Sequence, residues 1–152
     1  MYTFEEWKKN LIIVRGGGDI ATGTIYKLYQ SRFPVLVLEI ANPSCIRRTI
    51  SFCEAVFDKK VEVEGVTAKR AESLEDAFAI YGQGQIPVMI DENGSMIQEV
   101  QPPVVVDAIL AKRNLGTKIT DAPAVIGVGP GFCAGKDVDA VMKRKEVTIL
   151  AE

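Results

Sequence analysis

Residues 11–21 read Leu-Ile-Ile-Val-Arg-Gly-Gly-Gly-Asp-Ile-Ala, and this stretch decides the fold. Its first four residues are an unbroken apolar run, which predicts a strand buried on both faces. From Ile20 onward, apolar residues recur at helical spacing until Pro34 ends the helix. Residues 35–40 form a second apolar run. The segment is therefore predicted to be a strand-helix-strand unit with a right-handed crossover.

Short apolar or alternating runs predict further strands at residues 61–64, 86–90, 104–107 and 124–128. We expect a helix at residues 73–82, which open with a Ser-x-x-Asp capping pattern, and another at residues 136–144. Residues 46–52 fit a short helix and an irregular loop equally well. These elements predict one α/β domain over residues 1–152, with a Rossmann-like, mostly parallel sheet and flanking helices.

The composition excludes several classes of chemistry. The 152 residues include 18 basic and 20 acidic side chains, for a formal charge of −2. A nucleic-acid-binding protein usually has a basic balance, so we expect no nucleic-acid partner. The chain contains no histidine, so catalytic pairs and metal sites that need imidazole cannot form within it.

The sequence also predicts where the protein works. No apolar run approaches the roughly 18 residues that a membrane helix needs, and residues 1–9 lack the apolar core of a signal peptide. Cys45, Cys53 and Cys133 form no C-x-x-C pair and are expected to be free thiols. We therefore expect a cytoplasmic protein with no membrane partner and no metal site.

Gly16, Gly17 and Gly18 begin the pattern G-x-G-x-x-A between the first strand and its helix. In such a turn Gly16 permits the tight bend, Gly18 lets a phosphate approach the backbone, and Ala21 lets helix and strand pack closely. The amides and the dipole at the start of the helix favour an anion. Two interpretations stay open: a site for a nucleotide or related phosphorylated ligand, and a tight junction without a ligand.

Two acidic residues bear on that choice. Glu39 ends the second strand at about the spacing, ~20 residues, where dinucleotide sites place the carboxylate that binds ribose hydroxyls. Its charge would disfavour a 2′-phosphate, so an NAD-like ribose is favoured over that of NADP. Asp19 could instead cap the helix and occupy the amides that a pyrophosphate would use.

A second glycine-rich turn at residues 127–135 follows another predicted strand. In an open α/β sheet both turns would lie at the carboxyl ends of strands, where ligands bind. Gly129 and Gly131 either form a wall of the ligand site or belong to a turn that only connects two elements. Arg47, in the loop beyond the second strand, either reaches a ligand phosphate or lies on a solvated face.

Three further features of the sequence have open roles. Gly135-Lys136-Asp137 lacks the Ser or Thr of a Walker A motif, so kinase or ATPase activity by that route is not expected. Cys133 is either a reactive thiol at the start of a helix or a small buried residue. Asp107 ends a strand and either acts on a ligand or caps a turn.

Several segments, taken in order, resemble a known family. They are residues 15–23 (RGGGDIATG), 46–49 (IRRT), 54–56 (EAV), 63–66 (VEGV), 106–108 (VDA), 111–114 (AKRN) and 129–132 (GPGF), with Glu39 and Pro43. Together they are similar to the YqeB-type accessory proteins of the selenium-dependent molybdenum hydroxylase system. The resemblance implies a Rossmann-like protein that helps to mature a molybdenum hydroxylase by handling the molybdenum cofactor or its nucleotide. Members of this family are longer, which implies that the chain is a fragment or a shortened form.

The function expected from the sequence is that of an accessory protein which positions a phosphorylated small-molecule ligand for a molybdenum hydroxylase client enzyme. The ligand is unidentified, and the two candidates are an NAD-like dinucleotide and a molybdopterin dinucleotide. The alternatives are an NAD-dependent oxidoreductase domain and a non-catalytic interaction module with a vestigial nucleotide site. No catalytic residue is assigned. The expected ligand-binding residues are Gly16, Gly17, Gly18, Asp19, Glu39, Arg47, Gly129 and Gly131.

Overall fold

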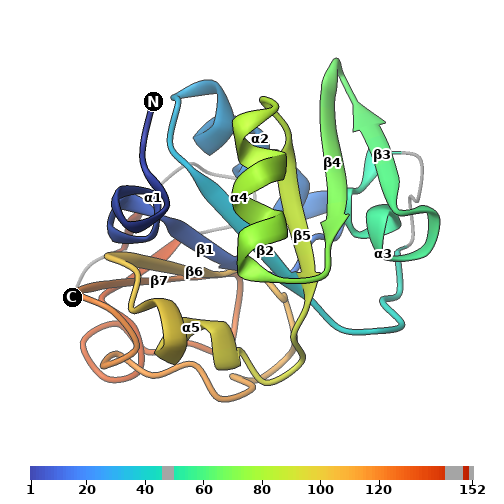
Figure 1. Cartoon of the computed structure of the whole chain (residues 1–152). Coiled ribbons are helices and arrows are strands. Elements are labelled where there is room, and N and C mark those ends of the chain that lie inside the picture. The colour runs from blue at the N-terminus through green and yellow to red at the C-terminus, as the bar shows by residue number, and fades with distance from the viewer. Residues whose placement is uncertain (46–49, 143–148, 151–152) are drawn as a thin grey trace.

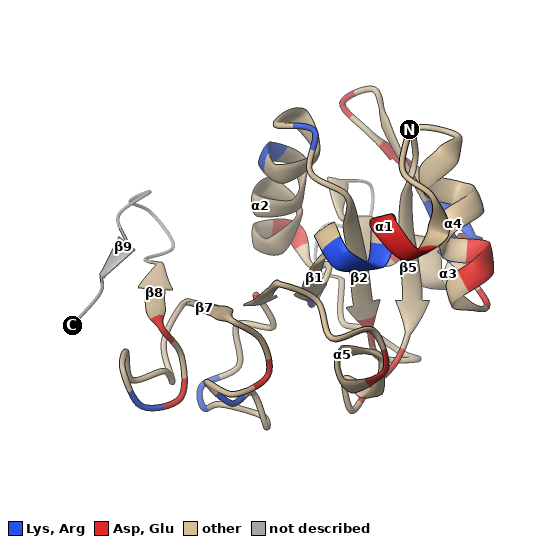
Figure 2. Ribbon diagram, turned by 60° about the vertical axis from the view of Figure 1, so that its left-hand side comes forward, with Lys and Arg blue, Asp and Glu red and all other residues tan. Residues whose placement is uncertain are grey.

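A mostly parallel sheet organises the protein in the computed structural model, which describes residues 1–45, 50–142 and 149–150 (Figure 1). The strands are β1 (Ile12–Arg15), β2 (Val35–Glu39), β3 (Lys60–Val63), β4 (Val66–Ala71), β5 (Ile86–Ile90), β6 (Val104–Asp107), β7 (Ala124–Val128), β8 (Ala140–Met142) and β9 (Ile149–Leu150). They lie in the order β3-β4-β5-β2-β1-β6-β7-β8-β9. Neighbouring strands are parallel, except that β3 with β4 and β8 with β9 are antiparallel. β8 lies on the side of the sheet away from α4 (Figure 2).

Helices cover both faces of this sheet. One face packs against α2 (Asp19–Gln30), the 3-10 helix η2 (Phe52–Glu54) and α3 (Ala55–Asp58). The other packs against α1 (Phe4–Asn10), α4 (Leu74–Gly82) and α5 (Ser95–Val100). Ile13 and Val14 of β1 are both fully buried, each in the core of a different face. Among the residues described here, no helix is both long and apolar enough to cross a membrane.

The position of β1 fixes where a ligand site can form. Its neighbours β2 and β6 run parallel to it on opposite sides, so the strand order reverses at β1. In open α/β sheets, ligands bind at such a reversal, outside the carboxyl ends of the strands. Gly16, Gly17 and Gly18 follow β1 at this place. The expected α/β class is confirmed in its mostly parallel sheet with flanking helices, which is consistent with a Rossmann-like fold.

The helix predicted at residues 136–144 is wrong. Asp139 donates its amide to the carbonyl of Val125 at 2.8 Å, and its carboxylate accepts the amide of Val125 at 2.8 Å. These two bonds hold the chain extended beside β7, and Ala140–Met142 then pair with β7 as β8. Residues 143–144 lie outside the described part of the chain, as do residues 46–49 of the segment that fitted either a helix or a loop.

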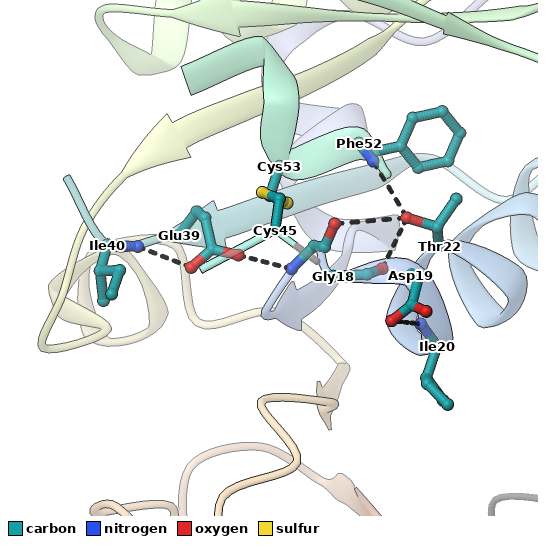
Figure 3. Close-up of a disulfide and its surroundings, with 10 residues drawn as sticks. Gly18, Asp19, Ile20, Thr22, Glu39, Ile40, Cys45, Phe52 and Cys53 are labelled. Atoms are coloured by element: carbon teal, nitrogen blue, oxygen red, sulfur yellow. Dashed lines mark hydrogen bonds between the residues drawn. A yellow bond between two sulfur atoms is a disulfide. The ribbon is translucent and has the colours of Figure 1, made fainter. Parts of the chain in front are cut away.

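The cysteines also differ from expectation. Cys45 and Cys53 form a disulfide with their Cα atoms 6.5 Å apart, so the prediction that these two are free thiols is wrong (Figure 3). The amide of Cys53 donates to the carbonyl of Gly17 at 2.8 Å, so the segment that carries Cys53 packs against the glycine turn. Cys133 is a free thiol, but it is exposed rather than buried. Since the helix expected after it does not form within residues 136–142, no helix dipole there activates the thiol.

Thr22 joins the glycine turn to η2. Its hydroxyl donates to the carbonyl of Gly18 at 2.7 Å and accepts the amide of Phe52 at 3.0 Å (Figure 3). Thr22 is only 4% exposed, so no water can readily replace this acceptor.

We predict that Thr22→Val lowers the free energy of unfolding by about 1–3 kcal/mol, because it leaves the buried amide of Phe52 without a partner. Thr24→Val, on the half-buried side of the same helix, is the matched control and should change stability by less than about 0.5 kcal/mol. Urea unfolding measures both. Equal stability of the two variants would remove Thr22 from the support of the turn.

Candidate functional site

The three glycines of the turn have different surroundings. Gly16 has φ +98°, and a Cβ there would lie 2.8 Å from the carbonyl oxygen of Ala108. A Cβ on Gly17 would lie 3.2 Å from the amide nitrogen of Cys53. A Cβ on Gly18 would meet no atom within 4 Å. The turn is therefore packed against protein at Gly16 and Gly17 and open at Gly18.

Glu39 lies beside the turn, as the sequence predicted from its position at the end of β2. One carboxylate oxygen accepts the amide of Gly17 at 2.8 Å, and the other accepts the amide of Ile40 at 2.8 Å (Figure 3). The amide of Gly17 is thus used by the protein itself. Each oxygen keeps a second lone pair that can accept a hydroxyl or an N–H group of a ligand.

The start of α2 offers donors at the open end of the turn. Gly18 is the N-cap residue of α2, and its carbonyl accepts the amide of Thr22 at 2.8 Å. Among the described residues, no acceptor pairs with the amide of Gly18. Asp19 does occupy one amide, because its carboxylate accepts the amide of Ile20 at 3.0 Å. The site therefore has a free amide and a helix dipole next to one opposing negative charge.

A buried polar network lies under the neighbouring edge of the site. Asp107 is 1% exposed and is the β6 partner of Arg15 in register. The hydroxyl of Thr117 donates to Asp107 at 2.5 Å and accepts from the guanidinium of Arg15 at 3.0 Å. The other carboxylate oxygen of Asp107 accepts the amide of Ile109 at 3.1 Å. Of its two predicted roles, Asp107 therefore fills that of a turn cap.

The second glycine-rich turn packs against the loop that follows β6. A Cβ on Gly129 would lie 2.4 Å from the side chain of Leu110, and one on Gly131 would lie 3.0 Å from the Cα of Arg113. Both glycines thus make room for the loop that follows β6. The same loop touches the first turn where Ala108 meets Gly16. Residues 108–110 therefore contact both turns.

Sequence reasoning missed two residues of this region and named one that the structure does not describe. Arg47 lies among residues 46–49, outside the described residues. Arg15 and Thr117 were missed because their contact joins positions far apart in the chain. The signal that could have found Arg15 is a charged residue at the end of an otherwise apolar strand, since such a residue is rarely buried without partners.

Hollows lie at both ends of the strands. One of about 160 Å³ opens at the carboxyl ends of the strands, beside Glu39 and Gly16. A larger one of about 510 Å³ lies at the amino ends, where Val35 begins β2 and Ile86 begins β5. We favour the smaller hollow as the ligand site because Glu39 and Gly16, the first residue of the turn, line it. The described residues contain no group of three or more Cys, Asp or Glu placed to hold a metal ion.

Comparison with known proteins adds one similarity. The chain is 50% identical over 133 residues to the uncharacterized protein YqeB of Escherichia coli (strain K12). This similarity supports the resemblance of the chain to the YqeB family. The matched region is 88% of the chain and 25% of the relative, so the chain spans about a quarter of the length of this YqeB protein. No model of a protein family matches the chain, and no solved structure matches it.

The different surroundings of the glycines give a direct test. Gly16→Ala forces a side chain into a left-handed backbone and against a carbonyl oxygen, so it should lower the free energy of unfolding by at least ~2 kcal/mol. Gly18→Ala places its methyl group in open space and should lower the free energy by no more than about 1 kcal/mol, because Ala is a poorer N-cap residue than Gly. Chemical denaturation of the two variants measures the difference. Similar losses in both would show that the turn is not packed as described.

Proposed function

We propose that the chain is an accessory protein that holds a phosphorylated, nucleotide-type ligand at the turn of Gly16, Gly17 and Gly18. Two neighbouring groups carry the proposal. One is the amide of Gly18, which has no partner among the described residues, and the other is the carboxylate of Glu39, which lies at the same turn. A ribose phosphate has the matching chemistry, because its phosphate needs amide donors and its hydroxyls need an acceptor.

The phosphate end of the ligand fits the start of α2. This helix has 12 residues, so its amino end carries a positive partial charge, and the unpartnered amide of Gly18, its N-cap residue, lies at this end. Asp19 opposes an anion, but its carboxylate is turned toward the amide of Ile20. A ligand phosphate would thus bind on the side of Gly18, where a Cβ would meet no atom.

The ribose end fits Glu39. A carboxylate whose oxygens each accept one backbone amide is fixed in place and still has lone pairs for two hydroxyls. A 2′-phosphate would bring a second negative charge against it. The ligand is therefore a dinucleotide or nucleotide with a free ribose 2′-hydroxyl, and NADP is disfavoured.

The biological setting of the proposal comes from the family. The similarity to the uncharacterized protein YqeB supports the resemblance to the YqeB family, and the link to the selenium-dependent molybdenum hydroxylase system is part of this proposal. We propose that the ligand is an NAD-like or a molybdopterin dinucleotide and that a molybdenum hydroxylase is the client enzyme. In this role the protein binds and positions the ligand, and redox chemistry belongs to the cofactor or to the client.

Thermal unfolding with NAD, NADP, ATP, CTP and a molybdopterin dinucleotide tests the proposal. A ligand at 100 times its Kd adds about 2.7 kcal/mol, which raises the Tm of a chain of this size by roughly 5–11 °C. We expect such a shift with at least one dinucleotide and none with NADP. Gly18→Val should remove the shift, because its side chain fills the space of the phosphate.

Gly23→Val is the control for this experiment. Gly23 lies on the exposed side of α2, where a Cβ also meets no atom within 4 Å, so the same side chain is added away from the turn. This variant should keep the full ligand shift. The proposal fails when no ligand raises the Tm, or when Gly18→Val keeps the shift. Hydride transfer from a small substrate to bound NAD, with formation of NADH, would instead support the oxidoreductase.

A further inference from the structure

The hollow at the carboxyl ends of the strands has apolar walls that reach the surface. Ile40 follows β2 and is 43% exposed, and Leu115 lies in the loop after β6 and is 50% exposed. Large apolar side chains scattered singly on a surface need no explanation, but these two line one hollow. Leu38 and Ile109 line it further in. A flat, uncharged ring between Ile40 and Leu115 would cover the apolar surface of both.

The loop that carries Leu115 is held rigidly. The side chain of Asn114 accepts the amide of Thr117 at 2.8 Å and donates to its carbonyl at 2.7 Å, which closes a turn around Leu115. Thr117 is in turn anchored by Arg15 and Asp107. The buried network therefore fixes one wall of the hollow before any ligand arrives, which lowers the entropic cost of binding.

The hollow is small for a whole ligand. Its volume is about 160 Å³. Sites for drug-sized molecules usually measure about 300–1,000 Å³, so this one suits a single ring system. Because Glu39 and Gly16 line it, a ring placed there would lie next to a ribose at Glu39 and at the start of the turn that ends in Gly18.

The polar groups of the hollow determine which hydrogen-bonding groups a bound ring must present at its edge. Arg15 is 6% exposed and has five N–H donors, of which the described residues engage two: one with Thr117 and a long one, 3.4 Å, with the carbonyl of Glu92. Glu92 is exposed and lines the hollow, and its carboxylate makes no hydrogen bond or ion pair within the described residues. Asp91 is not free, because its carboxylate accepts the amides of Ser95 and Met96.

We infer that the hollow takes a ring with a carbonyl next to two N–H donors, the edge shared by guanine and by pterins. The carbonyl of such an edge matches the free donors of Arg15, and the two N–H groups match the carboxylate of Glu92, which only accepts hydrogen bonds. Adenine presents an acceptor nitrogen beside its amino group, so its edge would face the carboxylate with a lone pair. This inference rests on the proposed function and names the class of ring that the ligand carries.

Isothermal titration of the full chain with GMP, AMP, ribose 5-phosphate, guanosine and neopterin tests the inference. We expect GMP to bind about tenfold tighter than AMP, as one well-placed charged hydrogen bond allows. Glu92→Gln should remove this preference. Leu115→Asn should reduce the affinity for GMP to that for ribose 5-phosphate. Neopterin carries the same edge without a nucleoside, so a lower Kd than that of guanosine would identify a pterin as the source.

Two matched variants control for surface changes. Glu99→Gln removes an exposed carboxylate on α5 that does not line the hollow, and Phe33→Asn removes an apolar side chain with the same 50% exposure as Leu115, near the amino ends of the strands. Both should keep the wild-type order of affinities. Equal affinities of GMP, AMP and ribose 5-phosphate would overturn the inference and leave the phosphate site of the proposed function intact. A different result would overturn the phosphate site and keep the inference: guanosine binds the wild-type chain and Gly18→Val equally well, and ribose 5-phosphate binds neither.

Discussion

The close fit of the glycine turn between two other segments is the constraint on which the rest of the site depends. Gly16 lies against the carbonyl of Ala108, and Gly17 lies against the backbone of Cys53. Any side chain at these positions would separate β1 from the loop after β6 or from η2. The hydrogen bond from the Gly17 amide to Glu39 is possible because the turn is this tight. Two of the three glycines therefore build the site, and Gly18 is left to face a ligand.

This division connects the turn with the hollow beside it. The loop that packs on Gly16 continues to Leu115 and is anchored by Thr117, Arg15 and Asp107. Glu39 lines the same hollow on its other side. A change at Gly16 would thus disturb the phosphate end and the ring end together, although they lie on different segments. The second glycine-rich turn also supports the loop after β6, because Leu110 of this loop fills the space left by Gly129.

Local patterns predicted β1, β2, β3, β5, β6 and β7 and placed Glu39 at the same edge of the sheet as the turn, because parallel strands place their carboxyl ends together; they predicted no strand at β4 or β8. The apolar runs at residues 35–40 and 104–107 correspond to β2 and β6. The helix at residues 136–144 was wrong because the bonds between Asp139 and Val125 are long-range, and no local spacing reveals them. The burial of Arg15 was missed for the same reason, because its partner Thr117 lies 102 residues further along the chain. The pairing of Cys45 with Cys53 spans only eight residues, and it was missed because the cysteine spacing matches no known pairing motif.

The most direct test of the central claim is the amide spectrum of the ¹⁵N-labelled chain during a titration with ribose 5-phosphate. The account predicts that the resonance of the Gly18 amide moves most, because this donor has no partner among the described residues and belongs to the open residue of the turn. The amides of Gly82 and Gly84, beside the larger hollow at the amino ends of the strands, should stay in place. Movement at Gly82 and Gly84 with an unchanged Gly18 would contradict the account and place the ligand at the opposite edge of the sheet.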